Sequence, residues 1–98
     1  MNTRIQSLIG MARGAGKVAT GNAQVEAMMK KRKGFVLIMA EDAPGTQKKY
    51  TQWAGDLNLP IVVNGTKLEL GHSIGLSPRS AVLILDQGFA KAILLARS

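Results

Sequence analysis

Three carboxylates follow predicted strands and could together hold a metal ion. Glu41 and Asp42 come after the apolar run 35–40, and Asp86 follows the apolar run 81–85. Open α/β sheets bind ligands at the carboxyl ends of their strands, and carboxylate oxygens are ligands that Mg²⁺ prefers. A small magnesium-dependent enzyme is therefore one hypothesis. In the structural alternative, Asp42 belongs to a turn, Asp86 caps the helix after it and Glu41 is solvated.

Other residue types needed for catalysis are scarce. The chain has one histidine, His72, and no cysteine, which excludes a Cys-based zinc site and a thiolate nucleophile. The segment 13–17, Arg-Gly-Ala-Gly-Lys, is similar to part of a phosphate-binding loop. However, Met11 and Val18 stand where that loop needs glycine and Ser or Thr. We therefore favour the structural alternative and expect no enzymatic activity, no metal and no cofactor.

Positive charge points to a different kind of partner. The chain has 13 Lys and Arg residues against 6 Asp and Glu, a net charge of +7. Such a surface attracts polyanions. Nucleic acid and an anionic membrane both fit, but no stretch combines a Lys and Arg face with a Trp, Phe and Leu face, as a membrane-surface helix does. We expect nucleic acid as the partner and no membrane contact.

Basic residues cluster in a few segments that could contact a phosphate backbone. The turn Leu76-Ser77-Pro78-Arg79 lies between a predicted short helix, which carries Lys67, and a predicted strand. A basic loop held between two rigid elements presents its cations in a fixed geometry. Lys17 lies just before a second helix, and the run from Lys30 to Lys33 ends it. Taken alone, that run is typical of a solvated helix end, where cations interact favourably with the helix dipole.

The start of this second helix is a further candidate site. Gly21 and Asn22 offer free backbone N–H groups, which form an anion site at a helix N-terminus. The side-chain amides of Asn22 and Gln24 can pair with base edges. Asn22 could instead be a simple N-cap, and a cap residue can do both. The candidate RNA-binding residues are Lys17, Gly21, Asn22, Gln24, Lys30, Lys67, Leu76, Ser77, Pro78 and Arg79.

Apolar spacing alternates between helical and strand periods along the chain. Helices are predicted at about 5–12, 22–33, 46–57, 66–74 and 87–96, and strands at 17–20, 35–40, 61–63 and 81–85. The run 35–40 is apolar throughout, as in a central strand covered on both faces, and 61–63 is predicted as a further buried strand. Thr46 is expected to cap the third helix, on which Tyr50 and Trp53 share one stripe facing the sheet.

This order predicts a three-layer α/β/α sandwich in which helices cover both faces of a small mixed four-stranded sheet. No linker, repeat or low-complexity segment interrupts residues 1–98, so we expect one RNA-binding domain. The longest apolar runs have about six residues, far below the ~20 that cross a bilayer, and the first residues do not form a secretory signal. We expect a cytoplasmic monomer.

The order of several motifs resembles a known family. Thr20-Gly21 with Val25, then Phe-Val-Leu-Ile-Met-Ala-Glu-Asp-Ala at 35–43, then Lys-Leu-Glu-Leu-Gly at 67–71 with Gly75, is similar to the kink-turn RNA-binding ribosomal proteins of the L-seven-Ae type. The segment 86–91, Asp-Gln-Gly-Phe-Ala-Lys, is most similar to their bacterial YlxQ-like branch. The resemblance covers nearly the whole chain and implies the same α/β/α sandwich.

What the resemblance implies is recognition of a sharply bent RNA in which sheared G·A pairs follow a bulge. In such proteins a Gly-x-Asn-Glu pattern at the start of the second helix reads the guanines, a lysine follows one turn later, and a loop before the last strand covers an extruded nucleotide. Gly21 matches the glycine, Lys67 matches a basic position of the fourth helix, and residues 76–79 occupy the loop.

This chain departs from that pattern at several positions. It has Ala23-Gln24 in place of Asn-Glu, Ala27 in place of the lysine, and the loop order Pro78-Arg79 in place of Arg-Pro. A glutamate accepts from both guanine donors, whereas the amide of Gln24 offers one acceptor. We therefore expect phosphate contacts to contribute more than base reading.

Three hypotheses from different classes follow. The first is a non-catalytic, ribosome-associated protein that binds structured RNA, such as ribosomal RNA. The second is a protein-interaction adaptor, since the fold resembles that of stress-response signalling proteins without an RNA partner. The third is the magnesium-dependent enzyme. A net charge of +7 favours the first over the second, and the scarcity of catalytic groups argues against the third.

Overall fold

The middle layer of the molecule is a mixed sheet. Within the described residues 2–97 of this computed structural model, the sheet has four strands in the order β1-β4-β2-β3. The strands are β1 (Val18–Thr20), β2 (Val36–Met39), β3 (Ile61–Val63) and β4 (Ala81–Ile84). β4 pairs antiparallel with both β1 and β2, whereas β3 pairs parallel with β2.

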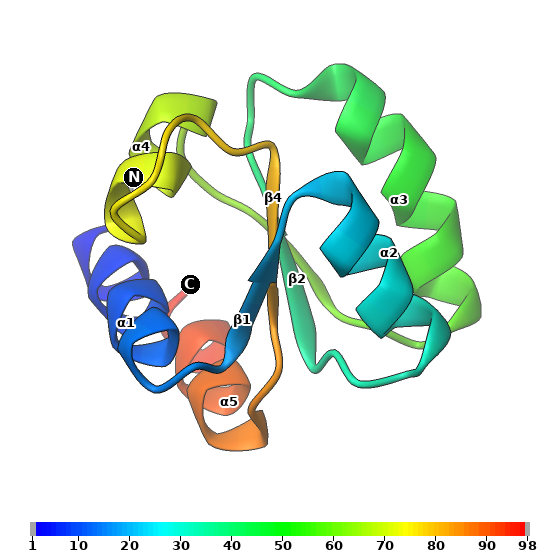
Figure 1. Cartoon of the computed structure of the whole chain (residues 1–98), viewed down its shortest axis with the longest axis horizontal. Coiled ribbons are helices and arrows are strands. Elements are labelled where there is room, and N and C mark those ends of the chain that lie inside the picture. The colour runs from blue at the N-terminus through cyan, green and yellow to red at the C-terminus, as the bar shows by residue number, and fades with distance from the viewer. Residues whose placement is uncertain (1, 98) are drawn as a thin grey trace.

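Helices cover both faces of this sheet (Figure 1). α1 (Thr3–Gly14), α4 (Lys67–Ser73) and α5 (Gln87–Ala96) lie on one face, and α2 (Asn22–Lys30) and α3 (Pro44–Asp56) lie on the other. The predicted three-layer sandwich with a small mixed sheet is confirmed. Within the part of the chain that the structure describes, no helix has the length and apolar character needed to cross a membrane.

Alternation along the central strands builds two cores. In β2, Val36 and Ile38 pack with α1, α4 and α5. Leu37 and Met39, which alternate with them, pack with α2 and α3. Successive side chains of a strand point to opposite faces, so a strand between two helix layers must be apolar throughout. Every residue of β2 and of β4 is buried. The predicted strand 35–40 is confirmed at its centre, but Phe35 precedes β2 and is 41% exposed.

Residues 61–63 form the predicted strand, but it is not buried throughout as expected. β3 lies at the edge of the described sheet and pairs with β2. Val62 is buried, but Val63 is 49% exposed. Three β-branched residues favour a pleated, half-buried surface, which an edge strand also provides. Composition alone therefore does not say whether a strand is central or at the edge.

Thr46 does not cap the third helix, contrary to the prediction. α3 begins at Pro44 after Ala43, and Thr46 lies inside its first turn. Proline suits this first position because its fixed φ fits the helix and the N–H that it lacks would have no intrahelical partner. On the predicted stripe, Tyr50 is fully buried, whereas Trp53 is only partly buried against the same core.

The strand register gathers several segments at one edge of the sheet. Thr20, at the end of β1, lies opposite Val82, and Met39, at the end of β2, lies opposite Ala81 and Val63. The segments that follow β1, β2 and β3 therefore meet the loop that precedes β4, at the top of Figure 1. The start of β1, the end of α2 and the end of β4 lie at the opposite edge.

Replacing Leu83 by Ala tests the contribution of β4 to the core. Leu83 is fully buried, and its side chain occupies the space that a Cβ on Gly34 would enter. The cavity should lower the free energy of unfolding by about 2–5 kcal/mol, measured by urea denaturation. Leu68→Ala is the control, because Leu68 is 68% exposed and should change stability by less than about 0.5 kcal/mol. Equal losses in the two variants would contradict this description of the core.

Candidate functional site

The start of α2 presents unpaired backbone donors. Gly21 is the residue before the helix, has φ 84°, and makes no side-chain cap. That left-handed conformation favours glycine, which explains the residue type at this position. The first-turn N–H groups of a helix have no intrahelical partner and can bind an anion. Asn22 is the first helical residue and not the N-cap, which leaves its side chain exposed beside these donors.

The two amide side chains at this helix start are already partly engaged. The N–H of Thr20 donates to Oε1 of Gln24 at 3.0 Å. The hydroxyl of Tyr50 lies 3.3 Å from Oδ1 of Asn22 and 2.8 Å from Oε2 of Glu26. A phenol has one hydroxyl proton, so Tyr50 donates it to the closer acceptor, the carboxylate of Glu26. Both side-chain amides keep their NH₂ donors available to a ligand.

The loop 75–80 is held close to α4. The N–H of Leu76 donates to the carbonyl of Gly71 at 2.9 Å, and the N–H of Arg79 donates to the carbonyl of Lys67 at 3.0 Å. A Cβ on Gly71 would lie 2.7 Å from the carbonyl carbon of Ser77 and 2.9 Å from Cα of Pro78. Glycine is needed here because the loop backbone approaches the helix so closely.

The side chains of this loop divide into packed and exposed groups. Leu76 is partly buried against the core, whereas Ser77 and Pro78 are exposed. Nη1 of Arg79 donates to Oγ of Ser77 at 2.8 Å. Nε of Arg79 is buried and has no hydrogen-bond partner within the described chain. The guanidinium therefore keeps unused donor capacity.

The start of α4 ties the neighbouring segments together. Thr66 and Glu69 form a capping box, and the N–H of Lys67 donates to Oδ1 of Asp42 at 2.8 Å. The Thr66 N–H bonded to the Glu69 carboxylate is the main cause of the lowered pKa of that group. The N–H of Glu41 donates to the carbonyl of Gly65 at 2.8 Å. The segments after β2 and β3 are thereby fixed to each other.

We use the name rim for the surface formed by residues 20–24, 65–67 and 75–80. The structure brings together here the predicted site residues Gly21, Asn22, Gln24, Lys67, Leu76, Ser77, Pro78 and Arg79. The hydroxyl of Thr20 donates to the carbonyl of Ala81 at 3.3 Å and joins the helix start to the end of the loop.

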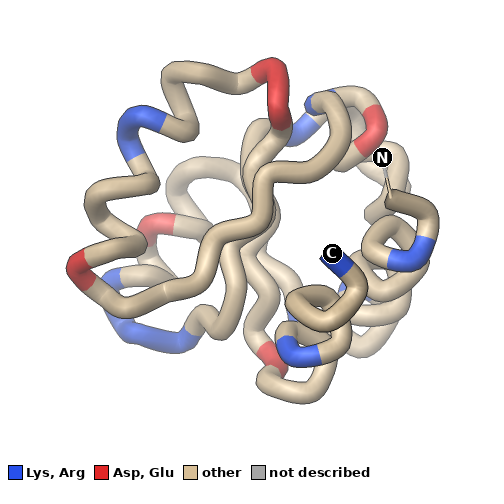
Figure 2. Tube along the Cα trace, turned by 180° about the vertical axis from the view of Figure 1, so that it is seen from behind, with Lys and Arg blue, Asp and Glu red and all other residues tan. Residues whose placement is uncertain are grey.

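Lys17 and Lys30 do not lie at the rim. Lys17 precedes β1 and Lys30 ends α2, so both are at the opposite edge of the sheet. The basic run from Lys30 to Lys33 extends past the end of α2, because Lys31 is the C-cap and Arg32 has φ 54°. Figure 2 shows this run as the longest continuous Lys and Arg stretch, at the lower edge of the molecule. The predicted RNA-binding residues therefore lie at two opposite edges of the sheet.

The proposed magnesium site does not form. β4 runs antiparallel to β2, so the end of β4 with Asp86 lies at the edge opposite Glu41 and Asp42. Within residues 2–97 no three His, Asp or Glu side chains gather closely enough to hold a metal ion. Asp86 is the N-cap of α5 and accepts from the N–H of Phe89 at 2.9 Å, as the structural alternative predicts.

A small polar cluster links α2 to α3. Nζ of Lys49 lies 2.9 Å from Oε2 of Glu26, which also accepts the Tyr50 hydroxyl at 2.8 Å. These hydrogen bonds, first that of Lys49 and then that of Tyr50, lower the pKa of Glu26 below its ordinary value of 4.5. Burial and the Glu26 carboxylate raise the pKa of Tyr50. The cluster fixes α2 against α3 one turn below the rim.

Comparison with known proteins identifies the family. The model of the Ribosomal protein L7Ae/L30e/S12e/Gadd45 family matches residues 3–94. The chain belongs to this family. Within it, RNA-binding protein YlxQ of Bacillus subtilis (strain 168) is 32% identical over 88 residues, which cover 89% of this chain and 88% of that protein. RNA-binding protein YlxQ of Enterococcus faecium is 33% identical over 89 residues, covering 90% and 85%.

Solved structures share the fold of this L7Ae-family chain. A protein of unknown function from Bacillus halodurans C superposes with a TM-score of 0.90 at 29% identity, covering 95% of both chains. A Giardia lamblia 15.5kD RNA binding protein superposes with a TM-score of 0.82 at 19% identity, covering 96% of this chain and 85% of that one. The expected resemblance to the L-seven-Ae type and its YlxQ-like branch is confirmed.

Some residues that shape the rim were not predicted to do so. Gly71 supports the loop, and a glycine inside a predicted helix is a recognised signal of close packing. Asp42 was assigned to a turn, yet it accepts from the N–H of Lys67, which lies 25 positions away. No local pattern indicates such a partner.

Replacing Gly71 by Ala tests whether α4 positions the loop. The added methyl overlaps the backbone at Ser77 and Pro78, so we expect a loss of about 1–3 kcal/mol in stability. Amide chemical shifts of residues 75–80 should move. Gly55→Ala is the matched control, because a Cβ there meets nothing within 4 Å, and it should gain up to about 1 kcal/mol. Unchanged shifts at 75–80 would show that the loop is held some other way.

The polar cluster gives a prediction about pH. Tyr50→Phe removes one hydrogen bond to Glu26, so the pKa of Glu26 should rise toward 4.5, and Lys49→Gln should raise it further because Lys49 is the larger cause. Carboxyl ¹³C titration measures both values. Since the folded pKa is the lower one, Glu26 stabilises the wild type above pH 4.5 and loses that effect as pH falls through its folded pKa. A Glu26 pKa unchanged in both variants would contradict the cluster.

Proposed function

We propose that this chain binds structured RNA at the rim and has no catalytic activity. Family membership and the names of its relatives, two RNA-binding proteins YlxQ and a 15.5kD RNA binding protein, support this function. The observation that carries the location is the pairing of Thr20 with Val82, which lays the start of α2 beside the loop 75–80. These segments would contact one RNA together.

Each part of the rim has a chemical role in this proposal. The free N–H groups at residues 22–24 face a phosphate or a base edge, favoured by the positive end of α2. The guanidinium of Arg79 is held at the loop by its hydrogen bond to Ser77. The exposed ammonium of Lys67 lies close by, because the Arg79 N–H donates to the carbonyl of Lys67. Base edges meet the NH₂ groups of Asn22 and Gln24.

We propose further that the preferred RNA is kink-turn-like and that the protein acts as a monomer on ribosomal RNA in the cytoplasm. The preference for a kink-turn should be modest. Oε1, the single acceptor atom of the Gln24 side chain, already accepts from Thr20, so only one of its two lone pairs is left for the two donors of a guanine. Ala23 and Ala27 supply no polar group. A glutamate at position 24 could keep the bond to Thr20 with one oxygen and offer the other to the RNA.

Restoring the family pattern tests this proposal. Wild type should bind a kink-turn RNA only modestly better than a hairpin of equal length. Ala23→Asn with Gln24→Glu adds two base contacts at about 1–3 kcal/mol each, so kink-turn affinity should rise by about one to four orders of magnitude while hairpin affinity stays nearly flat. Fluorescence anisotropy with labelled RNAs measures both.

Ala15→Asn with Gln87→Glu makes the same chemical changes on exposed residues at the opposite edge and should leave the ratio of the two affinities unchanged. Absence of RNA binding by the wild type at low salt would contradict the proposed function. A thousandfold wild-type preference for the kink-turn would contradict the roles given to Ala23 and Gln24.

A further inference from the structure

Most of the clustered positive charge lies away from the rim. We use the name basic edge for Lys17, Lys30, Lys31, Arg32 and Lys33, all of which are exposed. The rim itself carries Lys67 and Arg79, with Glu41, Asp42 and Glu69 beside them. The edge opposite the rim is therefore the more positive of the two (Figure 2).

Backbone pairing makes the basic edge one surface. The N–H of Leu85 donates to the carbonyl of Lys17 at 2.8 Å, and the N–H of Phe35 donates to the carbonyl of Ile84 at 2.9 Å. The end of β4 thus has Lys17 on one side and the segment after Lys33 on the other. Cations distant in the sequence are held on either side of a rigid strand.

The charges of the basic edge are not neutralised by the protein. Within residues 2–97 none of the five forms an ion pair, although Lys30 lies one turn from Glu26 and slightly lowers its pKa. Two carboxylates also lie at this edge, Asp56, which ends α3, and Asp86, which caps α5. Favourable interaction with the helix dipole accounts for a cation in the last turn of α2. Arg32 and Lys33 lie beyond that turn. Neighbouring like charges repel each other unless an anion lies between them.

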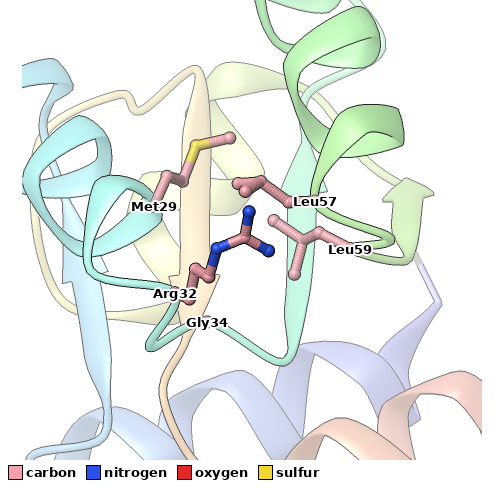
Figure 3. Close-up of a pocket in the computed structure, with 5 residues that line it drawn as sticks. All are labelled: Met29, Arg32, Gly34, Leu57 and Leu59. Atoms are coloured by element: carbon pink, nitrogen blue, oxygen red, sulfur yellow. The ribbon is translucent and has the colours of Figure 1, made fainter.

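The hollow beneath Arg32 is too small to hold a base. The hollow there is lined by Met29, Arg32, Gly34, Leu57 and Leu59 and measures about 50 Å³, far below the ~300 Å³ of a small-molecule site. Figure 3 shows the guanidinium of Arg32 directed toward Leu57 and Leu59, so its side chain closes this hollow. The lysines remain as exposed point charges, which suit phosphates and carry no sequence preference.

We infer that the basic edge is a second RNA-binding surface, which holds the phosphate backbone of another RNA segment independently of sequence. This inference rests on the proposed function. α2, with 9 residues, separates the two surfaces by about 13 Å along its axis. The rim then selects the RNA structure, while the basic edge supplies affinity that depends on salt.

Neutralising two exposed lysines tests this division. Lys31→Gln with Lys33→Gln should reduce the log–log salt slope of hairpin binding by about 1.4–1.8, which is roughly a 30-fold loss of affinity at 0.1 M salt. The kink-turn should lose affinity by the same factor, so the ratio between the two RNAs stays constant. Arg4→Gln with Lys48→Gln removes the same charge from exposed residues elsewhere and should change the slope by less than about 0.5. Thermal melting checks that all variants fold.

The outcomes separate this inference from the proposed function. Equal slope changes in the two double variants would overturn the second surface, because net charge alone would then explain the salt dependence. A change in the ratio of kink-turn affinity to hairpin affinity in Lys31→Gln with Lys33→Gln would also overturn it. Tighter Lys31- and Lys33-dependent binding to phosphatidylserine vesicles than to hairpin RNA at equal salt would assign the edge to a membrane instead. If Ala23→Asn with Gln24→Glu fails to raise kink-turn affinity, the proposed function is contradicted at the rim. Hairpin binding at the basic edge is still expected in that case.

Discussion

The antiparallel pairing of β4 with both β1 and β2 is the constraint on which the rest of the structure depends. It places the beginning of β4 beside the ends of β1 and β2, so the loop 75–80 must meet the start of α2. The same pairing separates Asp86 from Glu41 and Asp42 and thereby excludes a shared carboxylate site. One pairing pattern thus forms the rim and separates the three carboxylates on which the magnesium hypothesis was based.

Charge and shape are divided between the two edges of the sheet. The rim has fixed backbone donors, a glycine-supported loop and a guanidinium with a buried, unpaired Nε, but acidic groups lie beside its cations. The basic edge has exposed lysines, and the hollow beneath Arg32 is far too small for a base. Directed hydrogen bonds discriminate between ligands, whereas point charges attract any polyanion. This division explains why the rim is not the most positive surface of a strongly basic chain. Most of the clustered charge lies at the basic edge.

Sequence patterns predicted the elements well where the cause is local. The apolar run 35–40 required a central strand, and Asp86 capped the helix after it, because both signals act within a few residues. The prediction that Thr46 caps the third helix was wrong because the helix begins earlier, at Pro44. The edge position of β3 and the location of Lys17 and Lys30 depend on which strands pair, and β1 pairs with a strand more than 60 residues away. Spacing along the chain does not carry that information, although the family resemblance correctly indicated the fold.

The central claim is that RNA docks where the start of α2 meets the loop 75–80. The most direct measurement is a map of amide chemical shifts in ¹⁵N-labelled protein titrated with a short-armed kink-turn RNA at moderately high salt, where phosphate contacts are weakened. We expect the largest changes at residues 20–24, 65–67 and 75–80. Changes confined to Lys17 and the run 30–33, with the rim amides unmoved, would contradict it.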